Sequence, residues 1–194
     1  VFRDTAVGEL PDRLNILLLG GDSAADRIGL RTDSVTLASV DRETGETVMF
    51  SLPRNLEKVP FPSGSPLHAR FPSGFDCGDC LLNAVYTYAE TNKEQLFPGV
   101  IDPGPQAIKQ AVSAALGIPV HYYVLVNLEG FRGIIDALGG VTIRVERSLP
   151  IGAKGHRLPA GLQHLNGYQA LWYARSRSDS DDYQRMSRQR CVMG

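Results

Sequence analysis

The sequence predicts a single α/β domain, residues 1–194, in which helices flank a central mixed β-sheet. Short apolar runs rich in β-branched residues alternate with segments of helical periodicity along the chain. The composition is 43% hydrophobic and 21% charged, a globular balance that argues against disorder. A length of 194 residues matches one domain that can bury a substantial core.

Three strands are expected in the first quarter of the chain. Residues 13–21 form an apolar run closed by two glycines, which is typical of a buried strand ending in a tight loop. Residues 34–40 are rich in β-branched side chains and predict a second strand. A Thr-Gly turn then leads to a third strand at 47–52, so the last two strands form a hairpin. The proline-rich residues 58–76 predict a long loop, which in a compact domain is usually functional.

Beyond residue 80 helical periodicity dominates. Proline near the start and glycine just past the end mark helix limits, as at Pro105 and Gly117. The expected helices span 81–97, 105–116, 128–138, 166–174 and 182–193; the expected strands span 120–126 and 141–145, and residues 152–161 form a loop or short hairpin.

Charge and motif content exclude several classes of protein. The net charge is −1, so no bulk field favours nucleic acid, and we expect no such partner. Sixteen of the 20 basic residues are Arg, which suits bidentate phosphate binding but is equally explained by genomic base composition. No apolar run reaches the roughly 18 residues of a membrane span. A nucleophile elbow, a phosphate-binding Walker loop and an HExxH zinc motif are all absent from the sequence.

The cysteines suggest an oxidising compartment. Cys77 and Cys80 lie in an Asp-Cys-Gly-Asp-Cys segment whose glycine-rich flanks indicate a loop. We favour a structural disulfide between them, with a redox pair and half of a zinc site as alternatives. Cys191 stands alone near the end of the chain.

Two acidic residues flank the loop between the first two strands. Asp22 follows the first strand and Asp33 precedes the second, so both carboxylates belong at the same end of the sheet if these strands are neighbours. Carboxylates without a nearby thiol or imidazole suit a hard cation such as Mg²⁺. A capping Asp and a turn Asp are the alternative interpretation. Arg54, fixed by the preceding proline just past the third strand, adds a directed positive charge.

The densest polar cluster lies near the C-terminus. Arg175 and Arg177 point the same way on an extended segment. Asp182, Arg185 and Gln189 share one face of a helix because they are spaced i, i+3, i+7. Converging arginines repel one another without an anion, and each charge-assisted hydrogen bond to a pyrophosphate contributes about 1.5–3 kcal/mol. A solvated charged helix is the alternative.

The ordered set of segments resembles the LytR-CpsA-Psr family. Each segment alone is unspecific, but together they run in order from residue 14 to the C-terminus. The matching segments are Asn15 to Asp22, Arg31 to Ser34, Ser51 to Arg54, Leu82 to Tyr86, Tyr122 to Val124, Asn127 to Phe131, Asp136 to Val141, Leu165 to Leu171, and Tyr173 to Arg177 with Arg185 and Gln189.

This resemblance implies a polyprenyl-pyrophosphate site. A hydrophobic pocket between sheet and helices would hold the lipid, with Mg²⁺ or Mn²⁺ at its mouth. The implied metal ligands are Asp22 and Asp33, and the implied pyrophosphate-binding residues are Arg31, Arg54, Arg175, Arg177, Arg185 and Gln189. The implied catalytic residues are Asp33, Arg54, Arg175 and Asp182, with Asp33 or Asp182 as base toward the acceptor hydroxyl.

The implied activity is a phosphotransferase that moves a glycan from polyprenyl pyrophosphate to peptidoglycan. The cysteine loop is similar to actinobacterial, mycolate-containing members, for which the glycan is arabinogalactan or a related polymer. Because the chain begins at Val1, we expect an excised catalytic domain, a monomer on the extracytoplasmic face of the membrane behind an N-terminal anchor. A pyrophosphatase and a non-catalytic lipid-phosphate binder are the alternatives. Leu81 stands where many members have Lys, a contact that Arg70 could replace, and Arg54 is followed by Asn55 where they have Asp.

Overall fold

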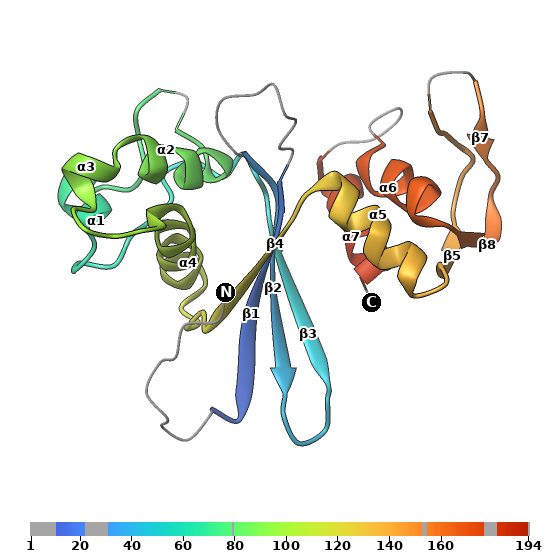
Figure 1. Cartoon of the computed structure of the whole chain (residues 1–194), viewed down its shortest axis with the longest axis horizontal. Coiled ribbons are helices and arrows are strands. Elements are labelled where there is room, and N and C mark those ends of the chain that lie inside the picture. The colour runs from blue at the N-terminus through green and yellow to red at the C-terminus, as the bar shows by residue number, and fades with distance from the viewer. Residues whose placement is uncertain (1–10, 22–30, 79, 153–154, 177–181, 194) are drawn as a thin grey trace.

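A four-stranded mixed sheet forms the centre of the computed structural model, which describes residues 11–21, 31–78, 80–152, 155–176 and 182–193. The strands are β1 (Arg13–Gly21), β2 (Thr32–Asp41), β3 (Thr47–Leu52) and β4 (Tyr122–Val126), in the spatial order β3-β2-β1-β4. The first three are antiparallel and β4 is parallel to β1. Helices lie on both sides of this sheet (Figure 1), which confirms the expected α/β class with a mixed central sheet.

One face of the sheet carries the main core. Leu17 and Leu19 of β1 pair with Leu37 and Val35 of β2, and all four side chains are buried. The alternation along each strand puts these residues on one face, where they pack against the helices that follow β3. The core thereby fixes the register of β1 and β2, since a slip by one residue would expose this apolar set.

The helices on that face differ from the expectation in two places. They are α1 (Pro66–Arg70), the 3₁₀ turn η1 (Leu82–Ala84), α2 (Val85–Thr91), α3 (Lys93–Leu96) and α4 (Pro103–Leu116). Helix α1 lies inside the segment expected to be a loop, and begins because Ser65 accepts a hydrogen bond from the Leu67 amide and Pro66 occupies the first turn. The single helix expected at 81–97 is interrupted at Asn92, whose side chain donates to the Tyr88 carbonyl.

The other side of the sheet carries a second helical group with its own core. Its elements are α5 (Leu128–Ala137), β5 (Val141–Val145), β6 (Leu149–Pro150), β7 (Arg157–Leu158), β8 (Gly161–Leu165), α6 (Gly167–Arg175) and α7 (Asp182–Met193). Strand β5 pairs with β8, a strand the sequence did not indicate, in a separate two-stranded sheet. The expected hairpin near 152–161 corresponds to the paired strands β6 and β7.

Close backbone packing joins α5 to α6. Asn166 caps α6 in a reciprocal arrangement with Gln169. The amide of Gly167 donates to Asp136 Oδ1 at 2.7 Å. A side chain at Gly167 would collide with the Arg132 backbone, so glycine sets how near the two helices approach. Among the helices in the described ranges, none has the length and apolar character needed to cross a membrane.

Candidate active site

The candidate site lies where β2 begins and β3 ends. Val35 and Leu52 are paired across these two antiparallel strands. Asp33 lies two residues before Val35 and Arg54 lies two residues after Leu52, so the register brings them opposite each other. Two segments that are 21 residues apart in sequence therefore meet at one end of the sheet.

Asp33 is the centre of this site. Its Oδ1 accepts a hydrogen bond from Arg54 Nη1 at 2.8 Å, which is also an ion pair. The same oxygen accepts from Asn83 Nδ2 at 3.3 Å. The backbone reinforces this arrangement, because the Asn83 amide donates to the Arg54 carbonyl at 3.0 Å. Asn83 lies in η1, so this short turn holds both partners of the carboxylate.

The carboxylate of Asp33 is held in its ionised form. Partial burial on its own would raise the pKa of this group. The hydrogen bond and charge of Arg54, the Asn83 amide and the charge of Arg185 outweigh that effect, and the pKa of Asp33 lies below its ordinary value of 3.8. The site is therefore an acid surrounded by cations.

Helix α7 supplies the second side of the site. Arg185 is buried, with 4% of its surface exposed, although arginine is almost never fully buried unless it is paired. Gln189, one turn further along, accepts a hydrogen bond from Ser34 Oγ at 3.1 Å. Because Ser34 follows Asp33 on β2, this bond ties α7 to the strand that carries the carboxylate.

The position of α7 depends on Arg188. Its Nε donates to the Tyr173 carbonyl at 3.1 Å and its Nη2 donates to the Ser176 carbonyl. Tyr173 lies in the last turn of α6, and Ser176 is the residue at which α6 ends. The guanidinium thus satisfies backbone acceptors at this helix terminus and fixes α7 beside it.

The predicted site residues divide into three sets. The structure brings together Asp33, Arg54 and Arg185, with Gln189 joined to them through Ser34. Arg31 and Arg175 have exposed side chains, and the structure gives neither a contact to Asp33. Asp22 and Arg177 lie outside the described residues, as does the side chain of Asp182 at the start of α7.

Two further expectations concern Arg70, as a replacement for the lysine that many family members have at the position of Leu81, and the cysteine pair. Arg70 lies over the ring of Phe71, with its Cζ 5.4 Å from the ring centroid, and makes no contact with Asp33 in the described structure. Sequence reasoning did not select Asn83 as a site residue, although it lies in a family-like segment. Cys77 and Cys80 form a disulfide with a Cα–Cα distance of 5.0 Å, in the loop that immediately precedes η1.

Asp33 also offers a test of whether the site suits a divalent cation. Both of these hydrogen bonds are accepted by Oδ1, and Oδ2 accepts none from the described residues. A carboxylate oxygen in this state can ligate a hard cation. The described residues contain no cluster of three or more His, Cys, Asp or Glu, so they supply Asp33 as one ligand rather than a complete cage. That fits Mg²⁺, which commonly takes one or two carboxylates and completes its shell with water and substrate phosphates.

The geometry defines an α/β domain with an acid–arginine site at one end of its sheet. The model of the LytR_cpsA_psr family matches residues 4–194, and the chain belongs to this family.

Named relatives match nearly the whole of this chain. The polyisoprenyl-teichoic acid–peptidoglycan teichoic acid transferase TagU of Oceanobacillus iheyensis is 32% identical over 187 residues, covering 94% of this chain and 50% of that protein. Biofilm regulatory protein A of Streptococcus mutans is 31% identical over 204 residues, covering 98% of this chain and 44% of that protein. The chain thus spans about half the length of the curated relatives it matches.

Solved structures agree on the fold. TagV of B. subtilis superimposes with a TM-score of 0.69 at 24% identity, covering 94% of this chain and 62% of that one. TagU of B. subtilis gives a TM-score of 0.60 at 26% identity, covering 94% and 64%. A structure described as TagT bound to LIIa-WTA gives 0.65 at 24% identity, covering 96% and 64%.

Proposed function

We propose that this protein is a phosphotransferase that moves a glycopolymer from a polyprenyl-pyrophosphate carrier to peptidoglycan. The observation that carries the proposal is the convergence of Arg54 and Arg185 on the ionised Asp33 at the end of the sheet. Guanidinium groups so placed suit the oxygens of a pyrophosphate. The family assignment and the transferase activity in the name of the TagU relative support this choice among anionic substrates.

The arginines would act on the charge of the leaving group. In the proposed step the acceptor hydroxyl oxygen bonds to the phosphorus that carries the glycan. The bridging P–O bond to the polyprenyl phosphate breaks, and the hydroxyl proton passes to a base. Arg54 and Arg185 would stabilise the negative charge that develops on the departing phosphate, an effect worth about 10²–10³ in rate for one well-placed donor. Arg31, Arg175 and Arg177 are proposed to bind the remaining phosphate oxygens.

Asp33 and Asp182 have different roles in the proposed reaction. Asp33 has a lowered pKa and binds Arg54, which suits a group that orients the arginine and ligates a metal better than it suits a proton acceptor. We therefore assign the base to Asp182. Mg²⁺ or Mn²⁺ held by Asp33 and Asp22 would neutralise phosphate charge when bound.

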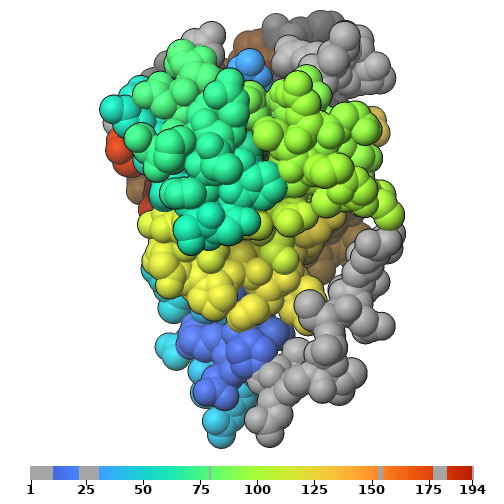
Figure 2. All heavy atoms as spheres, turned by 90° about the vertical axis from the view of Figure 1, so that its left-hand side faces the viewer, coloured from blue at the N-terminus to red at the C-terminus, as the bar shows by residue number. Residues whose placement is uncertain are grey.

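Exposed apolar strands provide a surface for the lipid tail. Val48 and Phe50 of β3 and residues 122–125 of β4 are each at least 36% exposed despite their apolar character. Figure 2 shows β4, in yellow, uncovered below the green helices. Strand β3 lies at the opposite edge of the sheet from β4, so only the four consecutive exposed residues of β4 form one apolar stretch. Contiguous exposed apolar surface marks an interaction site, and we propose that the polyprenyl chain lies along β4.

The donor polymer and the cellular location of the domain are proposed in addition to the reaction. The TagU relatives carry teichoic acid in their names. The sequence around Cys77 and Cys80 resembles that of actinobacterial members, and this resemblance implies arabinogalactan or a related polymer. We propose the latter polymer as the donor glycan. We also propose that the domain works on the extracytoplasmic face of the membrane, behind an N-terminal anchor.

A transfer assay tests the function. The protein is incubated with Mg²⁺, purified peptidoglycan and either lipid-linked arabinogalactan or lipid-linked teichoic acid, and glycan-bearing muropeptides are measured by mass spectrometry. We expect linked product with arabinogalactan and a fall of at least about 100-fold for Asp33→Ala. The exposed Asp76 provides the matched control, since Asp76→Ala removes the same charge outside the site.

The other outcomes identify the alternatives. Release of polyprenyl phosphate without any glycan on peptidoglycan would mean a pyrophosphatase. Binding of the lipid without turnover of either donor would mean a carrier-binding protein. If linked product formed only with lipid-linked teichoic acid, the protein would still be a transferase, but its donor would be teichoic acid and not arabinogalactan.

A further inference from the structure

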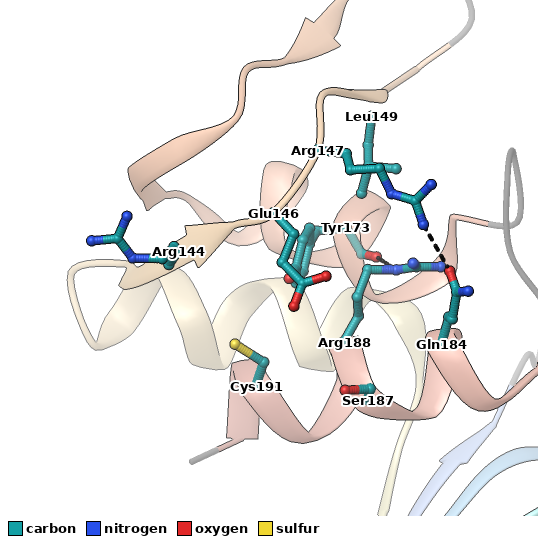
Figure 3. Close-up of a pocket in the computed structure, with 9 residues that line it drawn as sticks. All are labelled: Arg144, Glu146, Arg147, Leu149, Tyr173, Gln184, Ser187, Arg188 and Cys191. Atoms are coloured by element: carbon teal, nitrogen blue, oxygen red, sulfur yellow. Dashed lines mark hydrogen bonds between the residues drawn. The ribbon is translucent and has the colours of Figure 1, made fainter.

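A polar pocket lies on the other side of α7 from Asp33. It is a cavity of about 300 Å³ between the end of β5, α6 and α7. Figure 3 shows the side chains around it, which include Arg144, Glu146, Arg147, Gln184, Arg188 and Cys191. This volume is at the lower end of the range for small-molecule sites and suits one sugar-sized group.

The spacing of residues along α7 separates the two sites. Gln184, Arg188 and Cys191 are spaced i, i+4, i+7, so one face of the helix lines the pocket. Arg185 and Gln189 lie on a different face, toward β2. Helix α7 thus presents polar residues to two places at once, whereas a surface helix usually buries an apolar stripe.

The charge of the pocket favours an anion. Among the described residues that line it are three arginines and one glutamate, which together carry a formal charge of +2. Arg188 is held in place by the carbonyls of Tyr173 and Ser176, and Arg147 donates to Gln184 Oε1 at 3.2 Å. In Figure 3 Glu146 lies between Tyr173 and Cys191, on the side away from Arg147. The pocket therefore combines preorganised cations with an acceptor for sugar hydroxyl groups.

We infer that this pocket is an anion subsite for a carboxylate- or phosphate-bearing sugar of the polymeric substrates. The inference rests on the proposed function, under which both donor and acceptor are polymers longer than the reacting bond. An α-helix with its side chains is about 10–12 Å across, so a polymer engaged at Asp33 can reach around α7 to the pocket. The anion is either a peptidoglycan carboxylate or a phosphate in the donor polymer.

Cys191 provides a direct measurement of occupancy. It is an exposed free cysteine that lines the pocket. Its alkylation by iodoacetamide is followed in the full protein with no addition, with a soluble muropeptide bearing free carboxylates, or with a glycerol-phosphate oligomer. We expect one probe to slow alkylation, and the effective probe distinguishes the acceptor from the donor as the source of the anion.

Two charge-matched variants decide whether the pocket binds the probe. Arg147→Gln removes a lining cation, and Arg190→Gln removes a cation from an exposed position of the same helix outside the pocket. Loss of one charge-assisted hydrogen bond should weaken protection about 10-fold or more in Arg147→Gln. Arg190→Gln should protect as the wild type does.

Two results would overturn the subsite. One is that neither probe protects Cys191 in the wild type. The other is that both variants weaken protection equally, which would indicate general electrostatic attraction. Transfer activity is measured in the same preparations. Protection of Cys191 without transfer activity would support the subsite and contradict the proposed function. Transfer activity without protection would support the proposed function and contradict the subsite.

Discussion

At the scale of single residues, Asp33 shows how the strand register creates a site. Asp33 and Arg54 were each expected to be functional from their positions beside strands, and the pairing of Val35 with Leu52 explains why they meet. Asn83 was not selected, because a single amide within an apolar segment resembles an ordinary structural residue. Its role depends on a turn that brings residues 50 positions apart together, which no local pattern records.

The lowered pKa of Asp33 gives a pH-dependent prediction. Because the folded pKa lies below 3.8, the ionised carboxylate stabilises the fold at neutral pH, and this contribution disappears as the pH falls through the folded pKa. Asp33→Asn should therefore lower the free energy of unfolding at pH 7, and the difference from wild type should shrink below pH 3.8. Denaturant unfolding at several pH values measures this difference.

The exposed Asp76 is again the control for that experiment, since Asp76→Asn removes the same charge elsewhere. Taking the difference between variants also removes contributions from other acids, such as Asp41, whose pKa is lowered by hydrogen bonds from Thr44. A difference between wild type and Asp33→Asn that grows on acidification would contradict the assigned electrostatics.

At the scale of secondary-structure elements, sequence periodicity located most helices and strands but not their interruptions. Proline and glycine marked α4 well, since their backbone effects are local. Strand β8 was missed because its pairing with β5 depends on a partner about 20 residues away, and its sequence Gly-Leu-Gln-His-Leu has little β-propensity. The break at Asn92 depends on one side-chain hydrogen bond to a carbonyl.

The packing of α5 against α6 yields a prediction at this scale. Gly167→Ala would place a Cβ 2.3 Å from the Arg132 carbonyl oxygen, which is backbone and cannot move alone. We expect a loss of about 1–3 kcal/mol in the free energy of unfolding, even though alanine favours helices. Gly133→Ala on α5 is the matched control, because nothing lies within 4 Å of the added Cβ.

Thermal and denaturant unfolding measure both variants. Gly133→Ala should raise stability by about 0.5–1 kcal/mol, since its helical backbone already suits alanine. If Gly167→Ala were as stable as the control, the close approach of the two helices would not be maintained in solution.

At the scale of the whole molecule, the sheet lies between two helical groups with separate cores. The larger core joins β1 and β2 to α2 and α4, and the smaller one joins α5, α6 and the β5–β8 pair. The sequence predicted one domain and identified most of the segments that build the two cores, but not α1 in the larger core or β8 in the smaller one. Their separation could not be predicted, because it depends on which faces of the sheet the helices cover (Figure 1).

This separation predicts that the two groups open at different free energies. Leu165 is fully buried in the smaller core, and Leu165→Ala should remove about 2–5 kcal/mol from its packing. Native-state hydrogen exchange should show lower protection in α5 and α6, while amides of α4 and β1 stay unchanged up to the global unfolding limit.

Leu37→Ala in the larger core is the comparison variant, and should lower protection in both groups because the larger core carries the global stability. An equal loss of protection across both groups in Leu165→Ala would mean that the cores unfold as one unit. In that case α7, which packs against both the smaller core and β3, would transmit the cooperativity between them.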